Sequence, residues 1–130
     1  MPGTTDLTRL PLVLIVDDDA SLRLLCRVNL ELDGYRVVEA PNVAAAEEVL
    51  AGERVDLVLL DVHIGADDGI ALMRSLRQRQ HEAPVVLFTG SARLDSETTA
   101  EADGVVPKPF RLEQLLGVVR ELAPADLPRR

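Results

Sequence analysis

The amino-acid sequence predicts an α/β fold built around a parallel β-sheet. Short aliphatic runs alternate with segments whose apolar residues recur at helical spacing, and this order is typical of repeated βα units. The aliphatic runs are continuous rather than alternating with polar residues, which indicates strands that helices cover on both faces. The 130 residues suit a single domain, in which right-handed crossovers would place helices on both sides of the sheet.

The first half of the chain predicts two βα units. Residues 12–16 form the first strand, and residues 21–32 form a helix with apolar side chains along one side: Leu22, Leu25, Cys26 and Val28. Residues 35–39 are more polar, so we expect this strand at an edge of the sheet. Asn42 can cap a short alanine-rich helix over residues 43–51.

The middle of the chain continues the same alternation. Residues 55–60 form a third aliphatic strand, which ends at Asp61. Residues 69–79 follow as a helix that directs its arginines to solvent: Arg74, Arg77 and Arg79. Residues 84–88 form a fourth aliphatic strand, which ends at Thr89.

The last part of the chain predicts two helices of very different character. Residues 92–102 form a polar helix with little apolar area, so we expect it to be short, displaced or mobile. Residues 104–106 form a short fifth strand. Residues 111–122 form the final helix, whose apolar residues are spaced for one face: Leu112, Leu115, Leu116, Val119 and Leu122.

Composition restricts the classes of function. Hydrophobic residues make up 47% of the chain and aromatic residues 2%, which predicts an aliphatic core. The 22 acidic and 14 basic residues give a formal net charge of −8, which argues against nucleic acid or an anionic membrane as partner and suits a cation.

The single cysteine, Cys26, excludes an internal disulfide and is expected to be a buried thiol. Without a membrane span or signal peptide in the sequence, we expect a cytoplasmic protein.

Polar side chains follow four of the five predicted strands. Asp17 and Asp18 follow the first strand, Asp61 the third and Thr89 the fourth, and Lys108 lies just past the fifth. Because sites of such folds lie beyond the carboxyl ends of the strands, we expect these side chains to converge. Three converging carboxylates repel one another without a cation, and oxygen ligands without cysteine favour Mg²⁺.

These residue types predict phosphoryl transfer to a carboxylate. A carboxylate beside Mg²⁺ and an ammonium group stays ionised and can act as a nucleophile. Attack on a phosphoryl group would form an acyl phosphate. Mg²⁺, Lys108 and the Thr89 hydroxyl would then contact the oxygens of the added group. Asp19, the third acid of the run, is expected to cap the first helix.

Four segments carry a resemblance to a known family: VLIVDDD, VDLVLLDVHIGADDG, VVLFTG and VVPKPF. Together they resemble the receiver domain of two-component response regulators, the CheY-like superfamily. The resemblance covers essentially the whole chain and implies a flavodoxin-like, doubly wound (βα)₅ fold with strand order 2-1-3-4-5. It places the receiver at residues 11–123, after an N-terminal extension at 1–10 and before a C-terminal tail at 124–130.

The resemblance also implies roles for the residues at the strand ends. Asp61 would be the phosphoacceptor, Thr89 the switch hydroxyl and Lys108 the phosphoryl contact, with a cis peptide between Lys108 and Pro109.

The same resemblance implies a Mg²⁺ site. Asp17, Asp18 and Asp61 would hold the cation together with the backbone carbonyl of His63, and Asp18 would be a more direct ligand than Asp17. The His63 side chain is expected to be exposed.

The implied function is a signalling module rather than an enzyme. A histidine kinase or histidine phosphotransfer protein would donate the phosphoryl group, and the domain would catalyse only its own phosphorylation and dephosphorylation. The phosphorylated state would then alter contacts with a downstream protein. We expect no direct binding of nucleic acid or membrane, and a monomer or weak homodimer.

Three features depart from the family pattern. Val105 stands where the family usually has an aromatic residue, and Phe110 is expected to pack rather than to replace it. Thr89 and Lys108 lie only 19 positions apart (108 − 89), which leaves a short segment for the fourth helix. Gly65 stands where proline is common. The following acids, Asp67 and Asp68, are expected in a solvated turn that caps the third helix, or as charges that tune phosphate access.

Two other functions fit parts of the sequence. In a small phosphatase of the haloacid-dehalogenase type, DDDAS would supply Asp17 as nucleophile and Asp19 as acid/base, but that scheme leaves Asp61 without a role. In a receiver-like fold that binds partners without phosphorylation, Asp61 would be dispensable.

Overall fold

The computed structural model describes residues 10–90 and 94–125. Its strands and helices alternate as predicted, with one additional hairpin after the third strand. In chain order the elements are β1 (Leu12–Val16), α1 (Ala20–Leu32), β2 (Arg36–Ala40), α2 (Val43–Gly52), β3 (Leu57–Asp61), β4 (His63–Ile64), β5 (Asp67–Asp68), α3 (Gly69–Gln78), β6 (Val85–Thr89), α4 (Ser96–Glu101), β7 (Gly104–Pro107) and α5 (Leu112–Leu122). None of the helices in these ranges is long and apolar enough to cross a membrane.

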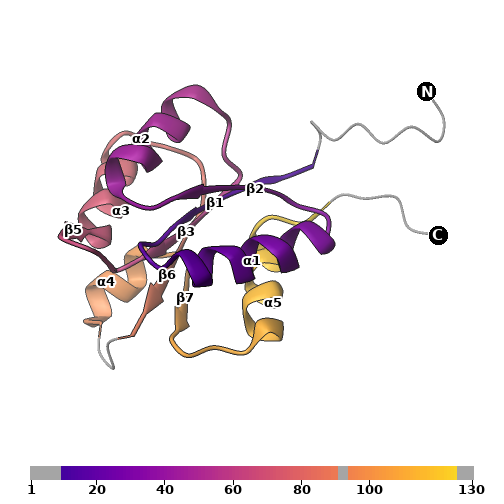
Figure 1. The fold of residues 1–130 in the computed structure, drawn as a ribbon. Helices are drawn as coiled ribbons and strands as arrows, with labels where there is room; N and C mark the ends of the chain where they lie inside the picture. The colour runs from indigo at the N-terminus through magenta and orange to yellow at the C-terminus, as the bar shows by residue number, and fades with distance from the viewer. Residues whose placement is uncertain (1–9, 91–93, 126–130) are drawn as a thin grey trace.

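Five parallel strands form the central sheet in the order β2-β1-β3-β6-β7, which confirms the predicted flavodoxin-like arrangement and the edge position of β2. The register pairs Val16 with both Ala40 and Leu60, and Thr89 with Pro107. The strands therefore end at one edge of the sheet. Helices α1 and α5 lie on one face, and α2 and α3 on the other (Figure 1).

The core consists of two aliphatic clusters, one on each face of the sheet. The first strand contributes to both, because successive side chains of a strand point to opposite faces. Leu12, Leu14 and Val16 pack with the residues of α2 and α3, whereas Val13 and Ile15 pack with those of α1 and α5. All five residues are buried, as the continuous aliphatic run predicts.

The buried side of α1 differs from the prediction. The sequence pattern places Leu25 and Val28 on one side with Cys26, whereas in the structure they are 49% and 47% exposed. The buried residues are Cys26 and Leu30, with Leu22 partly buried in the same cluster. The helix is rich in aliphatic residues, so apolar side chains recur at helical spacing along two neighbouring sides of it. Packing against the sheet decides which of these two sides is buried.

Helix α4 has six residues and begins later than predicted. Asp95 accepts a hydrogen bond from the Thr98 backbone N–H at 2.7 Å and caps the helix there. Residues 92 and 93 of the predicted helix lie outside the described residues. A short helix agrees with the low apolar content of this segment.

The arginines of α3, predicted to face solvent, remain partly exposed and also tie neighbouring elements together. They pair with acids as follows: Arg74 with Glu101, Arg77 with Asp103 and Arg79 with Glu47. The Arg74 guanidinium contacts both carboxylate oxygens of Glu101 and the hydroxyl of Thr98, which is buried in α4. Ion pairs therefore hold a helix that has little apolar area of its own.

Candidate functional site

The side chains predicted at the strand ends converge at one edge of the sheet. Asp17 follows β1, Asp61 is the last residue of β3, and Thr89 is the last residue of β6. Lys108 follows β7, and its backbone N–H donates to the Thr89 carbonyl at 2.7 Å. The peptide bond between Lys108 and Pro109 is cis, as the resemblance implies.

Lys108 joins two of the acids. Its Nζ lies 2.8 Å from Asp17 Oδ2 and 3.2 Å from Asp61 Oδ2. Asp17 is fully buried, and its other carboxylate oxygen accepts the Asp19 backbone N–H at 2.9 Å. Burial lowers the pKa of Lys108, but the contacts with Asp17 and Asp61 outweigh burial and raise the pKa overall. The ammonium group therefore stays charged and balances the buried acids.

Two aromatic rings support the lysine. Lys108 Nζ lies 5.7 Å from the centre of the Phe88 ring, a distance at which a cation is attracted to the ring face. The Phe110 ring stacks on Phe88 with centroids 5.4 Å apart. Phe110 is partly buried and packs against the core cluster that contains Phe88, as predicted.

Asp61 is held closely from several sides. Burial raises the pKa of its carboxyl group and the charge of Asp17 adds to this rise, while Lys108 and the His63 N–H act in the opposite direction. The His63 N–H donates to Asp61 Oδ1 at 3.3 Å. A Cβ atom on Gly69 would lie 1.9 Å from the Asp61 carbonyl oxygen, so only glycine fits at this position.

The acids can hold a cation. Asp17, Asp18 and Asp61 each offer a carboxylate oxygen, and these oxygens lie within 4.8 Å of one another. An all-oxygen donor set with several carboxylates suits a hard divalent ion. Asp18 is exposed, and its Oδ2 accepts the Gly65 backbone N–H at 3.1 Å. The His63 side chain is exposed, as predicted.

The segment after Asp61 places Asp67 and Asp68 at the surface, as predicted, but within a hairpin that the sequence did not predict. β4 and β5 pair antiparallel and form a hairpin. Asp68 caps α3 and Asp19 caps α1 by accepting the N–H groups of the second and third residues of each helix, which confirms both capping predictions. Asp67 Oδ2 accepts the Val43 N–H of α2 at 3.1 Å. Sequence reasoning missed this last contact, because nothing in the local pattern links the hairpin to α2.

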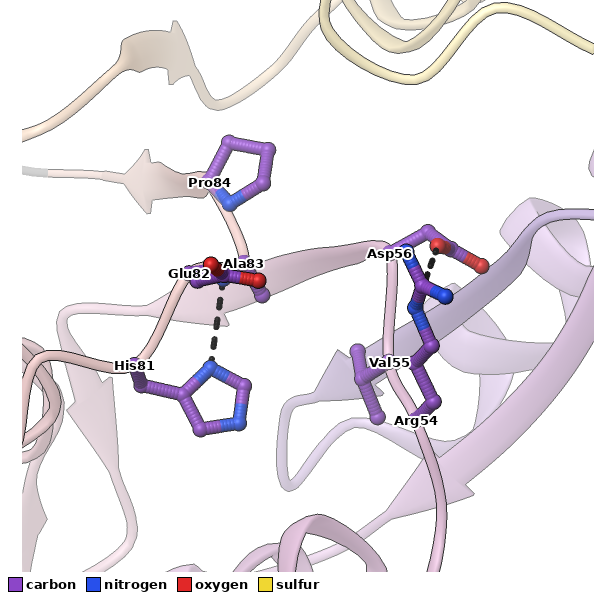
Figure 2. Close-up of a pocket in the computed structure, with 7 residues that line it drawn as sticks. All are labelled: Arg54, Val55, Asp56, His81, Glu82, Ala83 and Pro84. Carbon is purple, nitrogen blue, oxygen red and sulfur yellow. Dashed lines mark hydrogen bonds and ion pairs between the residues drawn. The ribbon is translucent and has the colours of Figure 1, made fainter.

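Two open cavities differ in their chemistry. One of about 510 Å³ adjoins the site and is lined by Thr89, Gly90, Leu94, Thr99, Val105, Pro107 and Lys108. The other, of about 500 Å³, lies where β3 and β6 begin (Figure 2). There Asp56 pairs with Arg54, and His81 accepts the Ala83 N–H (Figure 2). Asp56 also accepts the Leu12 N–H. Asp56 and His81 in this second cavity are therefore engaged with backbone N–H groups of the surrounding chain.

Comparison with known proteins identifies relatives of the sequence. The profile of the response regulator receiver domain matches residues 13–120. Response regulator MprA of Mycolicibacterium vanbaalenii is 34% identical over 119 residues, which cover 89% of this chain and 52% of MprA. MprA of Mycobacterium ulcerans is 35% identical over 113 residues, 85% of this chain and 49% of that protein. The chain therefore spans about half the length of the curated relatives it matches.

Solved structures share the fold. Response regulator TrrA of Thermotoga maritima in complex with Mg²⁺-BeF is 27% identical, with a TM-score of 0.79 and coverage of 86% of this chain and 98% of that chain. A response regulator of Burkholderia pseudomallei with a phosphorylated aspartic acid, a calcium ion and citrate is also 27% identical, with a TM-score of 0.73. The match covers 83% of this chain and 65% of that chain. The BeF3-activated receiver domain of Klebsiella pneumoniae RstA is 33% identical, with a TM-score of 0.74. The match covers 85% of this chain and 97% of that chain.

Proposed function

Because the chain belongs to the response regulator receiver family, we propose that it is a phosphorylation-controlled module whose phosphoacceptor is Asp61. A receiver is a signalling domain of two-component systems rather than a classical enzyme. One observation carries the choice of Asp61. Its side chain is 11% exposed, and its carboxylate lies 3.2 Å from Lys108 Nζ and within 4.8 Å of carboxylate oxygens of Asp17 and Asp18. We take residues 11–123 as the receiver unit.

In the proposed reaction, a phosphohistidine of a histidine kinase or histidine phosphotransfer protein is the donor. A carboxylate oxygen of Asp61 forms a bond to phosphorus, while the bond from phosphorus to the donor imidazole nitrogen breaks and its electron pair returns to that nitrogen. The Lys108 ammonium and the Thr89 hydroxyl meet the negative charge of the transferred group. Attack of water on the acyl phosphate later restores Asp61 and releases inorganic phosphate.

Mg²⁺ is the proposed cofactor. Asp17, Asp18, Asp61 and the His63 carbonyl oxygen would hold it, with Asp18 a more direct ligand than Asp17. When bound, the ion would neutralise charge on the phosphoryl oxygens. The all-oxygen donor set supports this proposal, as do the Mg²⁺-BeF of the Thermotoga structure and the calcium of the Burkholderia structure.

The phosphatase alternative has less support. Asp17, its nucleophile, is fully buried, and its carboxylate oxygens already contact Lys108 and the Asp19 backbone N–H. The Asp19 carboxylate, its acid/base, is engaged in capping α1. Asp61, by contrast, retains an exposed fraction through which a donor can approach.

The test is to phosphorylate the chain with acetyl phosphate and Mg²⁺ and to locate the modified residue by peptide mass spectrometry. We expect the label on Asp61 and its loss in Asp61→Asn. Asp19→Asn is the matched control, because asparagine also caps helices and this variant should be labelled normally. Label on Asp17 would support the phosphatase. An unlabelled chain whose partner binding is unchanged by Asp61→Ala would support a receiver that works without phosphorylation.

Helix α1 carries a candidate docking surface for the phosphodonor protein. Leu24, Leu25, Val28 and Leu32 are 58%, 49%, 47% and 81% exposed and form an apolar patch on the helix that starts beside the site. Exposed apolar patches of this kind mark protein interaction sites, and the net charge of −8 favours a protein over nucleic acid. Leu24→Ser with Val28→Ser should slow transfer from a donor protein at least tenfold and leave labelling of Asp61 by acetyl phosphate unchanged. Equal slowing with both donors would contradict the assignment.

The output face is proposed to be atypical. Val105 lines the cavity beside Thr89 where the family pattern has an aromatic residue, and α4 is short. The response to phosphorylation would then travel through movement of α4 and β7 rather than through rotation of an aromatic ring. Backbone amide chemical shifts measured with and without phosphorylation should change in α4 and β7, and changes confined to other elements would refute this output face.

A further inference from the structure

The hairpin after Asp61 has a turn that requires glycine. Its strands pair His63 with Asp68 and Ile64 with Asp67, which leaves Gly65 and Ala66 as a two-residue turn. Gly65 has φ of 59°, and a positive φ at the first central position matches a type II′ turn. In this conformation the Gly65 backbone N–H donates to Asp18 Oδ2 at 3.1 Å. A proline at this position could not make that hydrogen bond.

Asp67 fastens the other side of the hairpin to α2. Asn42 caps α2 through the Ala45 N–H and does not reach the Val43 N–H, which is one of the unpaired donors at the start of the helix. The Asp67 carboxylate accepts this N–H at 3.1 Å. The positive end of the helix dipole adds a favourable interaction with the negative side chain.

We propose that Asp67 is a positioning residue for the cation site, acting through the hairpin. By anchoring β5 on α2, Asp67 keeps the Gly65 N–H directed at Asp18 and so orients the carboxylate that would bind the cation. This inference rests on the proposed Mg²⁺ site and extends it to a residue that touches neither the cation nor the phosphoryl group.

The need for such an anchor follows from the size of the hairpin. Two paired strands of two residues each are unstable in water unless other contacts hold them. Ile64 is buried in the core and fixes β4. On β5, Asp68 is already engaged in capping α3, so Asp67 supplies the bond to α2. Asp18 is exposed and depends on neighbouring donors for its orientation, and hydrogen bonds to metal-binding carboxylates commonly tune affinity.

The experiment compares two substitutions of Asp67 in the full chain by isothermal titration with Mg²⁺. Asp67→Ala removes both the charge and the acceptor. Asp67→Asn removes the charge but keeps an oxygen that can accept the Val43 N–H, so it controls for the loss of a negative charge near the site. We expect Asp67→Ala to weaken Mg²⁺ binding about fivefold or more and Asp67→Asn to change it less than about twofold.

A second measurement does not depend on the cation. Hydrogen exchange of the Gly65 amide in metal-free protein should accelerate about tenfold in Asp67→Ala and stay near the parent rate in Asp67→Asn, because loss of the anchor frees this N–H. Equal Mg²⁺ affinity in both variants, or unchanged Gly65 exchange in Asp67→Ala, would overturn the inference while leaving the proposed function intact. Failure of the unsubstituted chain to bind Mg²⁺ would overturn the proposed cofactor and this inference together.

Discussion

Replacing Lys108 with methionine tests how the metal-free site is stabilised. The change keeps an apolar stem of similar length but removes the charge that lies 2.8 Å from Asp17 and 3.2 Å from Asp61. At an effective dielectric constant of about 20, a pair of unit charges at 2.8 Å gains about 6 kcal/mol and one at 3.2 Å about 5 kcal/mol. The cost of removing the ammonium from water offsets much of this gain. Loss of one partner from a buried pair costs about 3–5 kcal/mol, and because the Lys108 side chain is 25% exposed we expect the lower value, about 3 kcal/mol.

Urea unfolding followed by far-ultraviolet circular dichroism in a chelating buffer gives the free energy of unfolding directly. The control is the double-mutant cycle with Asp17→Asn, which removes the fully buried charge. In that background Lys108→Met should cost about 1 kcal/mol, a coupling of about 2 kcal/mol. Mg²⁺ should raise the melting temperature of Lys108→Met more than that of the parent, since the cation replaces the missing positive charge. A cost below about 0.5 kcal/mol, or equal costs in both backgrounds, would refute this account of the site.

Three further predictions concern the fold around the site. Gly69→Ala should destabilise the chain by about 3 kcal/mol and reduce acetyl phosphate labelling, because the new Cβ would lie 1.9 Å from the Asp61 carbonyl oxygen. Urea unfolding and the labelling assay measure the two effects. A variant as stable and as well labelled as the parent would contradict the close approach. Arg74→Ala should lower the free energy of unfolding only slightly but speed amide hydrogen exchange throughout α4, because the partly exposed contacts with Glu101 hold a helix with little apolar area. Unchanged exchange in α4 would contradict this role of Arg74. Burial, and secondarily the charge of Asp17, raises the pKa of the Cys26 thiol from 9.0 to about 12, so the unfolded chain releases this proton first as pH rises. The contribution of the thiol to stability is therefore complete well below pH 9 and falls by about 1.4 kcal/mol by pH 10, a decline that Cys26→Ala should lack when urea unfolding is compared at about pH 7 and pH 10.

The elements and the site residues were accessible to sequence reasoning because both depend on short stretches of chain. The LVLIV run of β1 is long enough and aliphatic enough to indicate a buried strand without knowledge of its neighbours. Asp61 and Thr89 directly follow such runs, and the rule that parallel strands end at one edge then brings them together. The caps supplied by Asp19 and Asp68 act on backbone groups two or three positions away, so sequence alone locates them.

Sequence by itself therefore determined the order of the five sheet strands and the five helices, the residue types at the carboxyl edge and the family to which they point. Tertiary structure decided which side of α1 is buried, which acids meet the arginines of α3 and how the hairpin after Asp61 is anchored. The physical reason is separation along the chain. Arg74 reaches Glu101 across 27 positions, Asp67 reaches Val43 across 24, and Gly65 reaches Asp18 across 47. Contacts of this kind depend on how the packed elements lie in space, and local periodicity carries no information about them.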